Sequence, residues 1–317
     1  MFSTPIEIEV SPKKITYQDR IMTLGSCFSE NIGKRMQSAY FSIDINPFGV
    51  LYNPISLLNS IELLVLNKAF NQDDIFKWND LWQSFSHSSL FSSPTQDACL
   101  SKINNQLDTS HSFFKQTDYL IITLGTAWVF EEKTTRKVVS NCHKLPSSEF
   151  LRRRLTVEEI VADYSMLIGK LKSLFPNLQL IFSVSPIRHW KDGAHENNLS
   201  KSILLLAIDK LKDLYDNVSY FPAYEIQMDE LRDYRFYDSD MLHPSEVAID
   251  YIWKRFSETY FDEKTLLIKK ELEQLSADLA HRPLQPDSVE FKKFQLNTEK
   301  KKIFLKNKYP FLESRIK

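Results

Sequence analysis

Glycine and cysteine are scarce in this sequence of 317 residues, which contains 6 glycines and 3 cysteines. So few glycines argue against glycine-rich loops that cradle phosphates, and the sequence shows neither a Walker A pattern nor a dinucleotide-binding fingerprint. The cysteines, Cys27, Cys99 and Cys142, are odd in number and lack the paired spacing of metal ligands. They indicate reduced thiols in a cytoplasmic protein. We expect no metal and no cofactor.

Long apolar runs and a charge of one sign are also missing. No stretch approaches the roughly 20 apolar residues of a membrane helix, and residues 1–10 lack a basic region that leads into an apolar one. The formal net charge is −1, so no overall field attracts nucleic acid or an anionic membrane. With 43% hydrophobic residues the chain can bury one large core. We expect no nucleic-acid or membrane partner, and the oligomeric state stays open.

Short apolar runs alternate with segments of helical periodicity, a pattern typical of a parallel sheet wrapped by helices. The predicted strands are residues 21–25, 42–46, 118–125, 178–185 and 218–221. The predicted helices are residues 53–67, 157–174, 199–215 and 244–260. We therefore expect an α/β protein with a flavodoxin-like three-layer α/β/α arrangement. Ligands of such sheets bind beyond the carboxyl ends of the strands, where Gly25, Asn46, Gly125 and Ser185 fall.

The remaining segments divide the chain into two parts. Residues 1–262 are interpreted as the main domain, with residues 68–117 as an insertion that folds over the site. Beyond it, residues 263–317 are interpreted as a C-terminal helical annex, because Leu266, Leu272 and Leu275 recur at helical spacing.

Two candidate nucleophiles follow Gly25 at the expected start of a helix. An apolar run ends at this glycine, and Ser26 and Cys27 come directly after it. Amides at a helix amino end lower the pKa of a thiol and favour a developing negative charge. The alternative is a buried turn in which Ser26 caps the helix and Cys27 only fills space.

A candidate acid–base pair lies near the end of the main domain. Asp240 precedes His243 by three residues in a turn closed by Pro244. A carboxylate at that distance can hydrogen-bond the imidazole and fix its tautomer, as in nucleophile–base–acid triads.

This order of motifs resembles the SGNH or GDSL-like hydrolase superfamily, and within it the GSCFA family. The resemblance rests on the strings Gly25-Ser26-Cys27-Phe28-Ser29, Asn46-Pro47-Phe48-Gly49, Trp82 to Ser88, Gly125-Thr126-Ala127-Trp128, Asn141-Cys142-His143-Lys144, Ser185-Pro186-Ile187-Arg188-His189 and Asp233 to His243. It implies a nucleophile two residues after the glycine, which places Cys27 ahead of Ser26, with His243 as base and Asp240 as orienting acid.

The resemblance also implies an oxyanion hole, and here the sequence departs from the superfamily. Gly49 or Asn46 corresponds to the second block of the superfamily. The third block, Gly125-Thr126-Ala127, has alanine where an asparagine is expected, so the candidate substitutes are Thr126, a nearby main-chain amide and Asn141. Loss of one oxyanion donor costs about two to three orders of magnitude in rate, which leaves weak activity or lost catalysis as alternatives.

Further polar residues are candidates for substrate contacts. They are His87, His143, Arg188, His189 and Arg235. Lys191 and Lys201 are expected in a solvated loop. The function expected is an esterase or deacylase that acts on a small-molecule or carbohydrate acyl ester. The alternatives are an O-acyltransferase to a sugar hydroxyl and a non-catalytic glycan-binding or scaffold protein.

Overall fold

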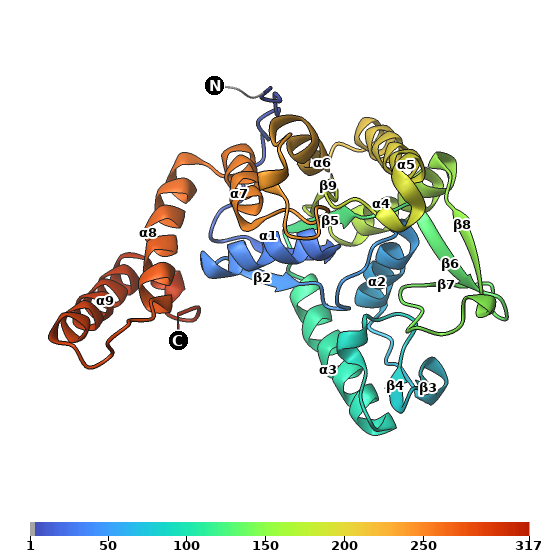
Figure 1. The fold of residues 1–317 in the computed structure, drawn as a ribbon, viewed down its shortest axis with the longest axis horizontal. Coiled ribbons are helices and arrows are strands. Elements are labelled where there is room, and N and C mark those ends of the chain that lie inside the picture. Colours follow the sequence, from blue (N-terminus) through green and yellow to red (C-terminus); the bar gives the residue numbers. More distant parts are fainter. Residues whose placement is uncertain (1–3, 317) are drawn as a thin grey trace.

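A five-stranded parallel sheet lies at the centre of the computed structural model, which describes residues 4–316 (Figure 1). From one edge to the other the strands are β2 (Ser42–Ile45), β1 (Arg20–Gly25), β5 (Tyr119–Leu124), β9 (Gln179–Val184) and β10 (Val218–Phe221). All neighbouring strands pair in parallel, and their order across the sheet is that of a flavodoxin-like sheet. The predicted fold class and all five predicted strands are confirmed.

Helices cover both faces of this sheet, because successive side chains of each buried strand point to opposite sides. In β5, Leu120 and Ile122 join one apolar core, whereas Tyr119 and Ile121 join the other. The first core is covered by α2 (Pro54–Leu66), α4 (Val157–Leu174) and α5 (Gly193–Leu214), and the second by α1 (Cys27–Ser38) and α7 (Glu246–Tyr260). The result is three layers.

Local signals explain where most of these helices begin. The Asn53 side chain caps α2 by accepting the Ser56 amide at 2.8 Å, and Thr156 with Glu159 forms a capping box on α4. The exception is α5, which begins at Gly193 instead of residue 199. Its first turn is polar and lacks the apolar periodicity on which the prediction depended.

The segment 68–117 is more than an insertion. It contains a short hairpin, β3 (Phe76–Trp78) and β4 (Leu81–Gln83), followed by the long helix α3 (Gln96–Phe114). The helix was not predicted, because a single buried residue per turn, such as Cys99 and Ile103, is hidden among polar neighbours. Helix α3 contributes Leu107 and Phe114 to the main core and leads into β5, so it is part of the central architecture.

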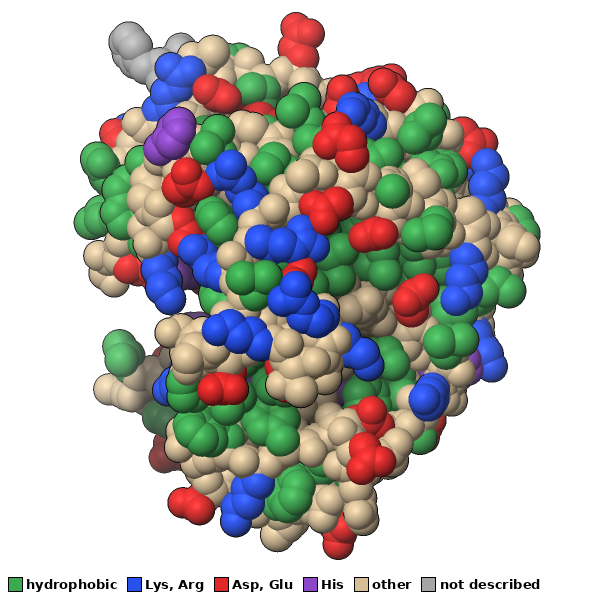
Figure 2. Space-filling view, turned by 90° about the vertical axis from the view of Figure 1, so that its right-hand side faces the viewer, with side chains coloured by type: hydrophobic (Ala, Val, Ile, Leu, Met, Phe, Trp, Pro, Cys, Tyr) green, Lys and Arg blue, Asp and Glu red, His purple; other side chains and the backbone are tan. Residues whose placement is uncertain are grey.

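A second sheet that the sequence did not predict follows β5. Its strands are β6 (Trp128–Glu132), β7 (Val138–Val139) and β8 (Phe150–Arg154), all antiparallel. It lies on the right of Figure 1, and Lys and Arg side chains gather across the centre of that side of the molecule (Figure 2). Charge conceals the strand character of β8, in which Arg152, Arg153 and Arg154 each pair with a carboxylate.

The C-terminal segment forms the expected helical annex from α8 (Glu263–Ala280) and α9 (Val289–Lys308), at the lower left of Figure 1. Helix α8 buries Ile268, Leu272 and Leu275 in the second core. The Ser276 hydroxyl also donates to the Ser38 carbonyl at the end of α1. The annex is therefore attached to the layer that carries Cys27.

Short helical turns complete the described chain at Gln72–Asp74, Ser89–Phe91, Ser147–Glu149, Trp190–Asp192, Ala223–Glu225, Ile226–Glu230, Tyr234–Phe236 and Pro310–Leu312. Across residues 4–316, no helix combines the length and the apolar character needed to cross a bilayer.

The turn after β1 requires glycine. Gly25 has φ of +149°, and a methyl group there would lie 2.4 Å from the Thr123 carbonyl oxygen. We expect Gly25→Ala to lower the free energy of unfolding by about 2 kcal/mol or more. In α4, a methyl group added at Gly169 would meet no neighbouring atom within 4 Å, so Gly169→Ala should instead stabilise by about 0.5–1 kcal/mol. Urea denaturation measures the unfolding free energy of both variants. Equal changes in this free energy would contradict the close approach of Gly25 to the Thr123 carbonyl.

Candidate active site

The strand-to-helix turn places Cys27 at the amino end of a helix. Ser26 occupies the cap position of α1 and Cys27 is its first residue, directly beyond the carboxyl end of β1. Burial raises the pKa of the Cys27 thiol. The amides of Cys27 and Phe28 and the Tyr52 hydroxyl act in the opposite direction and lower this pKa. The sulfur therefore lies among donors that favour negative charge.

His243 and Asp240 approach this sulfur from the loop before α7. The Nε2 atom of His243 is 4.0 Å from Cys27 Sγ, and its Nδ1 atom is 2.5 Å from Asp240 Oδ2. The other carboxylate oxygen accepts the amides of Leu242 and His243, each at 2.9 Å. These amides and the imidazole hold the pKa of Asp240 at about 2. The ionised carboxylate thus binds the Nδ1 proton and leaves Nε2 toward the sulfur.

Ser26 is placed differently from Cys27. Its side chain is buried, and its Oγ has no hydrogen-bond partner within the described chain. The imidazole of His243 contacts the sulfur of the next residue and not this hydroxyl. Of the two candidate nucleophiles, the thiol is therefore the one that contacts the imidazole.

Asn46 and Gly49 lock the turn from the adjacent loop. Asn46, with φ of 46°, accepts the Gly25 amide on its Oδ1 at 2.9 Å. The Gly49 amide donates to the Asn46 carbonyl at 2.6 Å. That amide is therefore engaged in its own turn, and the structure does not offer it to an oxyanion. Gly49 is also held closely, since a methyl group there would overlap Ser88 Oγ at 1.9 Å.

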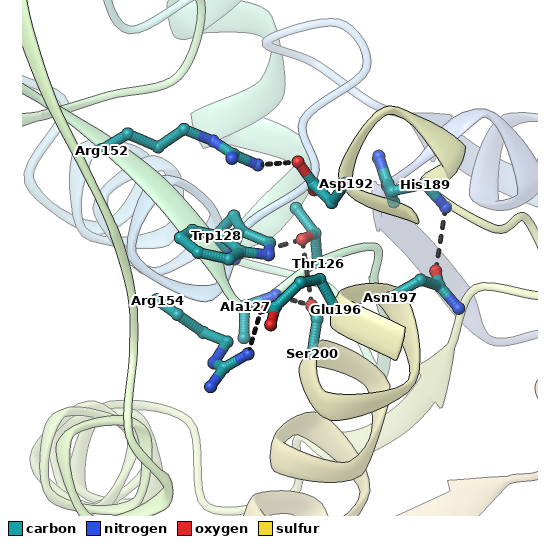
Figure 3. A network of polar contacts seen from close by, with 10 residues as sticks. All are labelled: Thr126, Ala127, Trp128, Arg152, Arg154, His189, Asp192, Glu196, Asn197 and Ser200. Atoms are coloured by element: carbon teal, nitrogen blue, oxygen red, sulfur yellow. Dashed lines mark hydrogen bonds and ion pairs between the residues drawn. The ribbon is translucent and has the colours of Figure 1, made fainter. Parts of the chain in front are cut away.

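The third block is held by α5 (Figure 3). Thr126 Oγ1 lies 3.1 Å from Ser200 Oγ and accepts the Trp128 amide at 3.1 Å. Ser200 Oγ also accepts the Ala127 amide at 2.8 Å. The hydroxyl of Thr126 therefore has a structural partner on each side and is not directed at Cys27.

Tyr52 is a site residue that the sequence analysis missed. Its carbonyl accepts the amides of Gly125 at 2.7 Å and Thr126 at 3.2 Å. Its hydroxyl is one of the groups that lower the pKa of the Cys27 thiol. Burial raises the pKa of Tyr52 to about 12. No local pattern marks this tyrosine, and only its position between Gly49 and the cap of α2 places it near the elbow.

His189 lies beside this group. Its amide donates to Asn197 Oδ1 at 2.9 Å (Figure 3), and its ring meets the Tyr52 ring edge-on, with the centroids 5.6 Å apart. Burial, followed by the charge of Lys201, lowers the pKa of His189 to about 4. The imidazole of His189 is therefore uncharged at neutral pH and packs against Tyr52 at the edge of the site.

A cleft of about 550 Å³ adjoins the loop of Asp240. Its lining includes Arg188, Trp190, Arg232, Tyr234, Tyr237 and Leu242. Arg188 stacks over Trp190 with its guanidinium carbon 5.1 Å from the ring centroid. Arg235 is exposed and pairs with Asp233 at 3.2 Å.

Three further candidates lie in a separate buried cluster. The ring of His87 packs 5.0 Å from Phe48 and 4.8 Å from Phe91, and burial lowers its pKa to about 3. His143 Nε2 lies 2.8 Å from the Ser84 carbonyl oxygen, and Asn141 Oδ1 accepts the His143 amide at 2.8 Å. The structure gives these residues partners in packing and does not bring them to Cys27.

The expectation for Lys201 was wrong. Instead of lying in a solvated loop, it is 1% exposed on α5. Its Nζ donates to the carbonyls of Gly125 at 2.8 Å and Ser185 at 2.7 Å. It thus joins the carboxyl ends of β5 and β9. Burial, followed by Arg188, lowers the pKa of Lys201 to about 7.

No group of three His, Cys, Asp or Glu side chains among the described residues could hold a metal ion. The site is built from a thiol, an imidazole, a carboxylate, a phenol and helix amides.

The flavodoxin-like sheet, the turn after its first strand and the Asp–His loop before α7 together define an α/β protein with a candidate site at the carboxyl edge of its sheet. The family comparison is more specific. Residues 20–256 match the GSCFA family, and residues 272–315 match the C-terminal domain of GSCFA domain proteins. The chain belongs to the GSCFA family, as the sequence motifs indicated.

Solved structures give more distant similarity. A family 3 carbohydrate esterase of Clostridium thermocellum is 16% identical with a TM-score of 0.33, over 80% of this chain and 98% of that one. An acetyl xylan esterase of Butyrivibrio proteoclasticus is 13% identical with a TM-score of 0.39, over 76% of this chain and 63% of that one. A search of curated proteins finds no match.

Lys201 should make folding stability depend on pH. Between its folded pKa of about 7 and the ordinary 10.5, the unfolded chain binds one more proton, so stability rises with pH. The unfolding free energy of wild type minus that of Lys201→Met should therefore grow above pH 7, by up to about 1.4 kcal/mol per unit. Chemical denaturation under reducing conditions measures it. Lys212→Met, which changes an exposed residue of α5, is the control. If the difference for Lys201→Met depends on pH no more than the difference for this control, the expectation is contradicted.

Proposed function

We propose that this protein is an acyl-ester hydrolase with Cys27 as nucleophile, His243 as general base and acid, and Asp240 as orienting carboxylate. The observation that carries the proposal is the chain of contacts from Cys27 Sγ to His243 Nε2 at 4.0 Å and from His243 Nδ1 to Asp240 Oδ2 at 2.5 Å. A separation of 4.0 Å is within the looseness expected of a site without substrate.

The first half of the reaction forms an acyl-enzyme. His243 Nε2 takes the thiol proton as the sulfur attacks the ester carbonyl carbon, and the carbonyl electron pair moves onto oxygen. When the tetrahedral intermediate collapses, the bond to the alcohol oxygen breaks and that oxygen takes the proton from His243. A thioester on Cys27 and a free alcohol result.

The second half releases the acid. His243 takes a proton from water, whose oxygen attacks the thioester carbonyl, and the carbon–sulfur bond then breaks as the proton returns to Cys27. Asp240 stays ionised throughout, because two amides and the imidazole hold its charge. Its role is to fix the ring orientation and to stabilise the imidazolium.

The cleft beside Asp240 suits the alcohol portion of the ester. Its mouth presents Tyr234 and Trp190, which are 74% and 51% exposed, next to the Arg188 guanidinium. Aromatic faces and hydrogen-bond donors together suit a ligand with alternating apolar and hydroxyl surfaces. A carbohydrate O-acyl ester is therefore our proposed substrate class.

The nucleophile is tested by paired alanine variants assayed on p-nitrophenyl acetate. Cys27→Ala should lower kcat/KM by about three orders of magnitude or more, because the covalent step is lost. Ser26→Ala should keep kcat/KM within about threefold of wild type, since it removes only a buried hydroxyl that has no hydrogen-bond partner.

Cys142→Ala is the matched control, because it removes another half-buried thiol. If the Cys27 variant keeps wild-type kcat/KM while the Ser26 variant loses it, the serine is the nucleophile. Turnover that appears only after a sugar acceptor is added would identify an acyltransferase instead.

A further inference from the structure

One arginine of the cleft beside Asp240 has no carboxylate partner. The other charged residues that line this cleft are each paired, as Arg232 with Asp229 at 3.0 Å, Asp233 with Arg235 at 3.2 Å, and Asp240 with His243 at 2.5 Å. The guanidinium of Arg188 forms no ion pair within the part of the chain that the structure describes. Its positive charge is therefore free to attract a negatively charged ligand.

Much of the hydrogen-bonding capacity of Arg188 is also unused. Its Nη2 donates to Asn198 Oδ1 at a long distance of 3.3 Å, and its buried Nε has no hydrogen-bond partner among residues 4–316. Leaving a buried donor without a partner costs free energy, which an acceptor on a ligand would recover. A guanidinium presents its donors in a planar fork that matches the oxygens of a carboxylate or a phosphate.

A second cation without a carboxylate partner is close enough to interact with Arg188. The Nζ of Lys201 donates to the carbonyls of Gly125 at 2.8 Å and Ser185 at 2.7 Å, and Ser185 precedes Arg188 by three residues. Burial, followed by the charge of Arg188, lowers the pKa of Lys201 to about 7. The carbonyls carry no net charge, so this part of the protein holds positive charge that favours an anion.

The cleft adjoins the site of Cys27 through neighbouring residues. Arg188 lines the cleft, whereas the ring of the next residue, His189, packs at the edge of the site. Asp240 also lines the cleft, and it binds the imidazole of His243. One ligand can therefore place an acyl group at the sulfur and a second group against the guanidinium.

We propose that this cleft binds a negatively charged group, a carboxylate or a phosphate, on the alcohol portion of the ester, and that Arg188 is the residue that binds it. The substrate is then an acylated acidic sugar and not a neutral one. Trp190, which stacks under the guanidinium at 5.1 Å, supplies an apolar face beside the bound anion. Arg188 determines specificity and takes no part in bond making. The inference rests on the proposed function of Cys27 and narrows its substrate class.

The first test compares three sugar esters that carry one acetyl group on the same hydroxyl: a methyl glucuronoside, a phosphorylated methyl glucoside and the neutral methyl glucoside. For wild type, kcat/KM should be about 10- to 100-fold higher for at least one charged ester than for the neutral one, the factor that a charged hydrogen bond contributes. The charged ester that is preferred distinguishes a carboxylate from a phosphate.

Arg188→Gln should reduce this preference to about threefold or less. Arg282→Gln is the matched control, because it removes an exposed positive charge between α8 and α9 and should leave the preference in place. A purely structural defect in Arg188→Gln would slow all three esters equally and keep the preference, and this result overturns the proposal. Equal turnover of the three esters by wild type, or turnover of p-nitrophenyl acetate alone, also overturns it.

A binding measurement keeps this inference separate from the proposed function. Calorimetry on Cys27→Ala protein, with the same three sugars without the acetyl group, should show at least one charged sugar binding about 10- to 100-fold more tightly than the neutral one. Adding Arg188→Gln should remove this difference, and adding Arg282→Gln should not. Equal affinities overturn the anion site even if Cys27 is the nucleophile. If wild type hydrolyses no ester, the proposed function fails, and the binding result alone decides on Arg188.

Discussion

The backbone of Gly25 is the constraint on which the rest of the site depends. Its amide is held by Asn46 Oδ1, its carbonyl accepts the Leu51 amide, and its α-carbon lies too close to the Thr123 carbonyl for any side chain. The loop between β2 and α2 and the neighbouring strand β5 thus converge on one residue at the carboxyl edge of the sheet. Because α1 begins two residues later, this convergence also fixes Cys27 relative to Tyr52 and to the loop of His243.

The electrostatics of the site follow from that arrangement. Cys27 and Tyr52 are buried enough for the pKa of each to rise, which would suppress a thiolate if no donors faced it. Helix amides and the phenol oppose this effect, and His243 gains a permanently charged partner in Asp240. The proton can therefore move between sulfur and imidazole while the carboxylate remains ionised.

Much of the fold could be predicted from the sequence because buried parallel strands are continuous apolar runs. Residues 119–124 are entirely buried, and the same pattern at β1 and β9 made the sheet visible. The prediction failed where a strand or a helix turn consists of polar residues. The strand β8 carries three arginines that pair with carboxylates outside the strand, and α5 begins with a polar turn.

The candidate site was also predictable only in part. Gly25, Asp240 and His243 belong to local motifs, so their chemistry can be read from neighbours in the chain. Tyr52 and Lys201 have no such signal, because the groups they contact lie just beyond the carboxyl ends of β5 and β9 and meet them only in the folded protein. The same reason applies to His87, whose aromatic partners come from three separate segments.

The most direct test of a covalent thiol mechanism is to identify the residue that carries the acyl group. Acid-quenched turnover of p-nitrophenyl acetate, followed by peptide mass spectrometry, should find acetyl on the peptide of Cys27, removable by neutral hydroxylamine as a thioester is. Acetyl on Ser26, stable to neutral hydroxylamine, or turnover with no acylated peptide at steady state or in the pre-steady-state burst, would contradict the account.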